Sequence, residues 1–157
     1  METFEFNVEI SAEPQRVSAA FWDMEAWPAM APHVHAIDMH YCDDNVQVLT
    51  MQIATNGRIN SFKSVRVRQR DTIFYFQPEP PPILREHQGA WRIASHPTGT
   101  VVTCYHSIEI DEDAAALFLR EIGTKTPDAD TRRQKVLELI HKNSLQMMLA
   151  LKKRLES

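Results

Sequence analysis

The chain has 157 residues, of which 43% are hydrophobic and 24% charged, a length and mixture that fit a single domain over residues 1–157 with one core. With 17 basic and 21 acidic residues the formal net charge is −4, so the surplus of Lys and Arg that a nucleic-acid binder needs is missing. No stretch approaches the roughly 18 to 20 apolar residues that span a bilayer, and no signal-peptide core opens the chain, so we expect a cytoplasmic protein.

Residues 1–10 alternate apolar and polar side chains. This period of two predicts a strand with one buried face. The next segment offers Ser11 as a candidate helix N-cap and Pro14 in the first helical turn. Two further prolines, Pro28 and Pro32, exclude one long helix in this segment. Two short helices with a kink near Trp27 are therefore expected.

From His33 to Ile110 the pattern changes to short β-rich runs divided by turn residues. Six strands are predicted, at 34–41, 45–54, 58–69, 72–77, 84–94 and 100–110. Connections this short join antiparallel neighbours, so the seven strands should form one meandering sheet. The run Pro80-Pro81-Pro82 cannot lie in a central strand, which leaves a stiff loop at the rim or a proline-rich docking motif.

Residues 111–130 give no regular pattern; their apolar side chains could form a single turn or cover the mouth of a cavity. From Asp130 or Thr131, either of which can cap it, a long amphipathic helix is predicted. Its apolar stripe consists of Leu137, Ile140, Ser144, Met148, Leu151 and Leu155, widened by Val136 and Met147. At about 1.5 Å per residue this helix is long enough to lie across the whole sheet.

A curved sheet and a straight helix match along only part of their length, so a space remains between them. That space is the natural ligand site. Methionines adapt to irregular apolar surfaces and could line it, or they could simply fill the core. They are Met24, Met30, Met39, Met51, Met147 and Met148.

The order of elements resembles that of the START-like, helix-grip superfamily. The stretch WDMEAWPAMAPHV, the hairpin NGRINSFKSVRV and the closing helix resemble the single-domain aromatase/cyclases of bacterial aromatic polyketide synthesis, of the tetracenomycin type. The EAWP turn recurs across the superfamily, whereas the Ser64-x-Arg66 pair is more specific to the cyclases. The resemblance covers nearly the full chain. It implies an α+β helix-grip fold, with a curved seven-stranded antiparallel sheet around the C-terminal helix and two short helices after the first strand.

Residues two apart on a strand share a face, so Phe62, Ser64 and Arg66 should point together. An arginine facing an apolar cavity is unfavourable unless it is paired. Arg66 could hold a ligand oxyanion in a charge-assisted fork, or it could lie at the rim and bind a carboxylate such as Glu86 or Glu109. The resembling enzymes place a serine and an arginine inward here, which favours the first interpretation.

On inward positions of the sixth and seventh strands the resembling enzymes carry apolar or aromatic residues, whereas this chain differs. It has Arg85, His87 and Gly89 on one strand and Cys104 and His106 on the other. Two imidazoles in the cavity could exchange protons near neutral pH, or they could be satisfied structural residues. Gly89 would leave extra room for a ligand.

Two more residues are candidates for contact with a ligand. The resemblance implies that Trp27 lines or gates the cavity. Alternatively, Trp27 only anchors the kinked helix. Asn143 could present its amide to the ligand or lie on an exposed flank. The two cysteines lack the spacing of a zinc site, and no phosphate-binding loop is present, so neither a metal nor a cofactor is expected.

The resemblance implies an enzyme that accepts a poly-β-ketone on an acyl carrier protein and closes an aromatic ring by aldol condensation and dehydration. Arg66 would polarise a carbonyl or stabilise the enolate. Ser64 would relay protons through a water, and His87 or His106 would act as acid or base. Residues 132–157 hold seven bases and two acids, a local charge of 7 − 2 = +5, which could meet the acidic carrier or simply face water.

Two alternatives remain open at this stage. A non-catalytic carrier or sensor would enclose a lipid, a quinone or another small hydrophobic molecule without needing an ordered set of polar side chains. A structural subunit of a biosynthetic complex would have a collapsed cavity.

Overall fold

The computed structural model describes residues 1–157 and contains one seven-stranded sheet. The strands are β1 (Glu2–Ile10), β2 (Val34–Cys42), β3 (Val46–Thr55), β4 (Arg58–Gln69), β5 (Thr72–Glu79), β6 (Leu84–His96) and β7 (Gly99–Ile110). The helices are α1 (Pro14–Trp22), α2 (Trp27–Met30), α3 (Glu112–Glu121) and α4 (Ala129–Glu156), with a single 3-10 turn, η1 (Met24–Ala26), between α1 and α2.

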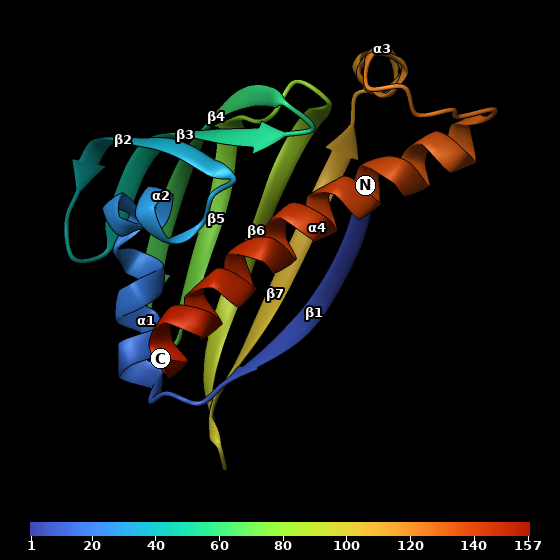
Figure 1. The fold of residues 1–157 in the computed structure, drawn as a ribbon. Helices are drawn as coiled ribbons and strands as arrows, with labels where there is room; N and C mark the ends of the chain where they lie inside the picture. The colour runs from blue at the N-terminus through green and yellow to red at the C-terminus, as the bar shows by residue number, and fades with distance from the viewer.

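All strand pairs are antiparallel, in the order β1-β7-β6-β5-β4-β3-β2. Strands β2 to β7 form a meander, and β1 is added at the edge beside β7. The sheet curves around α4, which crosses one of its faces, while α1 and α2 lie beside the C-terminal end of α4 (Figure 1). The predicted helix-grip fold is therefore confirmed. No helix combines the length and the apolar character needed to cross a bilayer.

The turn between β3 and β4 sets the register of the strands that carry the site. Asn56 and Gly57 have φ values of 51° and 76°, the left-handed pair that a two-residue hairpin requires. Gly57 adopts this conformation without strain, and asparagine tolerates it better than most residues. The hairpin pairs Leu49 with Ser64 and Gln47 with Arg66.

The segment after β1 forms short helices, as predicted, but Ser11 does not cap the first. Helix α1 begins at Pro14, after Glu13, and no side chain caps its N-terminus. The chain then turns through η1 before α2 starts at Trp27, with Pro28 in its first turn. The expected break near Trp27 is present because proline is compatible with the first turn of a helix and not with its interior.

Residues 111–130 contain a helix that the sequence analysis left unassigned. The Asp111 carboxylate accepts a hydrogen bond from the Ala114 amide at 3.0 Å and caps α3. The long helix α4 is likewise capped by Asp128, which accepts from Thr131 N at 2.7 Å. Its cap therefore lies earlier in the chain than the predicted Asp130 or Thr131.

The core consists of two hydrophobic clusters. The larger lies between the sheet, α1, α2 and the C-terminal half of α4, and includes Phe21, Trp27, Leu49, Met148 and Leu151. The smaller joins α3 and the N-terminal half of α4 to the ends of β6 and β7, and includes Ile108, Phe118, Leu119, Val136 and Ile140. Residues of both clusters line one internal cavity.

Candidate functional site

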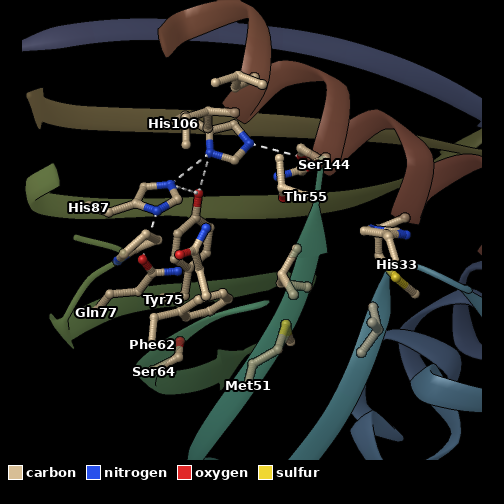
Figure 2. Close-up of a pocket in the computed structure, with 18 of the residues that line it drawn as sticks. His33, Met51, Thr55, Phe62, Ser64, Tyr75, Gln77, His87, His106 and Ser144 are labelled. Atoms are coloured by element: carbon tan, nitrogen blue, oxygen red, sulfur yellow. Dashed lines mark hydrogen bonds between the residues drawn. The ribbon is translucent and has the colours of Figure 1, made fainter. Parts of the chain in front are cut away.

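The cavity lies between the inner face of the sheet and α4. Its volume is about 140 Å³. Hydrophobic residues make up 15 of the 26 that line it. The polar minority includes Arg66 on β4. It also includes a group of hydrogen-bonded side chains from β5, β6, β7 and α4 (Figure 2). A mainly apolar cavity with a few convergent polar groups is typical of a small-molecule site.

The structure brings most of the predicted site residues to this cavity. Those that line it are Trp27, Phe62, Ser64, Arg66, His87, His106, Asn143 and Met147. Those that do not are Met30, Arg85, Gly89 and Cys104.

Arg85 faces solvent because β6 is irregular at its start. The register between β6 and β7 shifts between Leu84 and Glu86, so the simple alternation of faces fails there. Leu84 is buried, and Arg85 is exposed with its Nε 3.8 Å from Asp111. The alternation holds again from His87 onward.

The other three residues are close to the interior without lining the cavity. A Cβ atom at Gly89 would collide with the Tyr75 hydroxyl and the Tyr105 carbonyl, so the missing side chain makes room for a phenol rather than for a ligand. Cys104 lies in the core with its Sγ 3.2 Å from the Met148 sulfur, and burial raises the pKa of its thiol to about 12. Met30 packs, partly buried, against the larger core cluster.

Arg66 is completely enclosed by the protein. Its Nη1 donates to Gln47 Oε1 and its Nη2 to the Phe21 carbonyl, both at 2.8 Å, while Nε has no partner. The guanidinium carbon lies 5.0 to 5.6 Å from the ring centroids of Trp22, Trp27 and Trp91, within the range of cation–π attraction.

No carboxylate compensates the charge of Arg66. Glu86 and Glu109, the alternative rim partners, form no ion pair with it. Burial and then the nearby charge of Arg68 lower the pKa of Arg66 to about 9, so it is still a cation at neutral pH. A buried cation without a counterion favours an anion in the adjacent cavity.

Three side chains meet at the other polar group. His106 Nδ1 lies 2.7 Å from the Tyr75 hydroxyl and 3.0 Å from His87 Nε2, and the hydroxyl lies 3.3 Å from His87 Nε2. Two further side chains complete the network: Gln77 Oε1 is 2.8 Å from His87 Nδ1, and Ser144 Oγ is 2.9 Å from His106 Nε2. Figure 2 shows the hydroxyl between the two imidazoles.

Both imidazoles are neutral near pH 7. Burial lowers the pKa of His87 to about 4. For His106, burial followed by the proximity of His87 and His141 lowers the pKa to about 3. Phe4 stacks on the His106 ring at a centroid distance of 4.7 Å and helps to exclude water. Each ring can therefore accept a proton, and it would do so most easily when an anion forms beside it.

Trp27 combines the two alternatives that the sequence left open, whereas Asn143 lies at the cavity with its amide bonded to another side chain. Trp27 lines the cavity and also anchors α2, because its Nε1 donates to the Ala20 carbonyl at 3.1 Å. Asn143 is partly buried and donates from Nδ2 to Thr55 Oγ1 at 3.2 Å, which links α4 to the end of β3. Its amide is therefore already engaged.

Sequence reasoning missed Tyr75 and Gln77, and it placed Ser144 only in the apolar stripe of α4. A signal for the first two was present: Ile73, Tyr75 and Gln77 alternate with the exposed Phe74 and Phe76 along β5. The sequence analysis predicted a strand over residues 72–77 without assigning either of its faces to the core. Alternation along this strand, with a hydroxyl and an amide on one face, would have identified both residues.

Comparison with known proteins supports this description of the fold. No protein family model and no curated protein matches the sequence. Among solved structures, the di-domain ARO/CYC BexL from the BE-7585A biosynthetic pathway is 25% identical over 99% of this chain and 50% of that one, with a TM-score of 0.86. The Zhui aromatase/cyclase from a Streptomyces species is 22% identical over 99% of this chain and 93% of that one, with a TM-score of 0.81.

A START superfamily protein from Mycobacterium smegmatis is more distant. It is 16% identical over 98% of this chain and 97% of that one, with a TM-score of 0.75. The chain thus has the START-like helix-grip fold, and its solved neighbours include aromatase/cyclases. It spans half the length of the di-domain protein BexL.

Proposed function

We propose that this chain is a polyketide aromatase/cyclase, which binds a poly-β-ketone tethered to an acyl carrier protein and directs its aldol cyclisation and dehydration. The observation that carries the proposal is the network of His87, His106 and Tyr75 in the same apolar cavity as the buried cation Arg66. A passive carrier of a hydrophobic molecule needs neither group, since each is unfavourable to bury. Similarity to BexL and Zhui supports the same reaction class.

Selection of one conformer is the first task of such an enzyme. A poly-β-ketone carries many activated methylene groups and carbonyls, and it reacts with itself in several ways. An enclosed cavity restricts the folded conformations and holds one methylene carbon close to one carbonyl carbon, which replaces a random encounter by an oriented one. The apolar side chains around the cavity supply the shape that makes this selection.

Stabilisation of the enolate is the second task. Removal of a proton from the methylene carbon places negative charge on an oxygen, and the uncompensated guanidinium of Arg66 lowers the free energy of that anion in a mainly apolar cavity. Its Nε is buried and has no hydrogen-bond partner in the protein. Ser64, two residues earlier on β4 and also in the cavity lining, would hold a water that relays protons.

Proton transfer is the third task, and the imidazoles are in the right state for it. Neutral His87 and His106 can accept the methylene proton, and the imidazolium that results is stabilised by the enolate formed at the same time. The isolated imidazolium is disfavoured by burial. Uptake of the proton is therefore coupled to formation of the anion.

The carrier protein would approach the basic C-terminal region. Residues 132–157 carry the local charge of +5 and lie within α4 and its end, the helix that covers the cavity. Acidic helices of a carrier would be attracted to such a surface.

The test is reconstitution. A ketosynthase and an acyl carrier protein extend malonyl units to a poly-β-ketone, and the products are separated and weighed with and without this protein. We expect one regular aromatic product to replace a mixture of spontaneous products. An unchanged mixture, together with a stoichiometric lipid or quinone in the native mass spectrum of the purified protein, would instead identify a carrier.

A further inference from the structure

The positions of the hydrogens in the polar network follow from one group whose role is known, the side-chain oxygen of Gln77. Gln77 Oε1 can only accept a hydrogen bond, so His87 Nδ1, 2.8 Å away, carries a hydrogen. Because His87 is neutral, its Nε2 carries none. The contact of 3.0 Å between that nitrogen and His106 Nδ1 then requires a hydrogen on the latter.

The rest of the network follows from the same reasoning. With its hydrogen on Nδ1, neutral His106 has none on Nε2, so Ser144 donates to it at 2.9 Å. In the 2.7 Å hydrogen bond between these side chains, His106 Nδ1 is then the donor and the Tyr75 oxygen is the acceptor. The hydrogen of Tyr75 itself is left with only two distant acceptors: the Tyr105 carbonyl and the already engaged His87 Nε2, both at 3.3 Å.

We infer that Tyr75 is the catalytic acid of the dehydration step and donates its hydroxyl proton to the oxygen that leaves the substrate as water. This inference rests on the proposed function and assigns one of its steps to a specific residue. Tyr75 lines the cavity, and its hydroxyl is the network donor without a close protein acceptor. Gly89 positions it, because any side chain there would displace the hydroxyl.

The step balances within the network. The C–H bond next to the ketone breaks, and its proton goes to the lone pair of His87 Nε2, which gives up the hydrogen bond from His106 Nδ1; that N–H then donates to the Tyr75 oxygen alone. The enolate then forms the C=C bond as the C–O bond of the β-hydroxyl breaks, and the Tyr75 proton joins the leaving oxygen to make water. Transfer of the proton from His87 Nε2 to the phenolate, across 3.3 Å, restores both residues.

The surroundings suit a phenol in this role. Burial raises the pKa of Tyr75 well above its usual value of 10, so the proton is present over the whole working range of pH. The hydrogen bond from His106 Nδ1 stabilises the transient phenolate. Arg66 is still the group that stabilises the enolate, so the two charges develop beside different partners.

Tyr75→Phe removes the hydroxyl and keeps the ring, and Tyr41→Phe is the matched control because Tyr41 is exposed and lies outside the cavity. The probe is a synthetic cyclic β-hydroxy ketone, whose loss of water is followed by the absorbance of the enone. General acid catalysis contributes about 10²- to 10⁴-fold, so we expect kcat for Tyr75→Phe to fall by about that factor with little change in KM. Tyr41→Phe should match the wild type, and circular dichroism verifies the fold of each variant.

The outcomes separate this inference from the proposed function. Equal rates of water loss for the wild type and Tyr75→Phe, or no dehydration of the probe by the wild type, would overturn the role of Tyr75. Water loss that depends on Tyr75 supports it, even if reconstitution shows that the protein closes no ring. In reconstitution, Tyr75→Phe should release a cyclised product heavier by one water.

Discussion

Nη1 of Arg66 donates a hydrogen bond of 2.8 Å to Oε1 of Gln47, and each of the two residues is only 1% exposed. Gln47 Nε2 in turn donates to the Trp22 carbonyl at 2.7 Å. One buried amide thus connects the end of α1 to the guanidinium that faces the cavity. The orientation of Arg66 depends on a neighbour that the sequence analysis did not name.

Gln47→Leu tests this connection. The change leaves a buried guanidinium donor and the Trp22 carbonyl without partners, and each such group costs about 1–3 kcal/mol. We therefore expect the free energy of unfolding to fall by about 3 kcal/mol, measured by urea denaturation. Gln52→Leu, on the other face of β3, is the control and should change it by less than about 0.5 kcal/mol. Equal stability of the two variants would show that the Arg66–Gln47 contact contributes nothing.

The fold was predictable because its signals are local and repetitive. Alternation over residues 1–10 and 58–69 identified β1 and β4, and the same parity placed Ser64 and Arg66 inward. The prediction failed for Arg85, because a register shift at the start of β6 depends on pairing with β7 and leaves no mark in the sequence.

The candidate site was predictable only in part. His87 and His106 attracted attention as unusual residues on inward positions, but their contact with each other depends on the pairing of β6 with β7 and of both with β5. Helix α3 was missed because few of its residues are strongly apolar. Its N-terminal signals, Asp111 followed by Glu112 and Asp113, were nevertheless present in the sequence.

Stability should decrease in mild acid because of the two buried imidazoles. Between pH 6.5 and about 4 the unfolded chain binds a proton on each ring, whereas the folded chain does not, so stability falls as the pH falls through this window. For His87 alone the difference in pKa corresponds to about 3 kcal/mol. Urea denaturation from pH 7.5 to 4.5 measures it.

One variant accompanies the pH measurement. His87→Gln removes one of the responsible groups and should reduce the slope of stability against pH. A wild-type stability that is constant between pH 7 and pH 5 would contradict the assigned pKa values.

Gly89→Ala should disturb the phenol of Tyr75. The added methyl group would meet the Tyr75 hydroxyl and the Tyr105 carbonyl, so the strand or the phenol must move. We expect a loss of stability greater than the roughly 1–2 kcal/mol that Gly57→Ala costs through its positive φ alone, since nothing lies within 4 Å of a Cβ at Gly57. Thermal denaturation compares the two variants, and a smaller loss for Gly89→Ala would argue against this packing.

The two cysteines should differ sharply in reactivity. Cys42 is exposed, whereas Cys104 is buried against Met148 with its thiol pKa raised to about 12. An alkylating reagent should modify one thiol in the folded protein and both after unfolding, as counted by mass spectrometry. Cys42→Ser should remove the reaction of the folded protein; rapid modification of Cys104 in that variant would show that the core around it opens.

The proposal that the cavity directs ring closure is tested most directly by the regiochemistry of the product. Malonyl units labelled with carbon-13 are extended to a poly-β-ketone on its carrier protein, and nuclear magnetic resonance locates the new carbon–carbon bond. With the protein present, the account predicts one bond position in nearly all of the product. The same distribution of positions with and without the protein would contradict it.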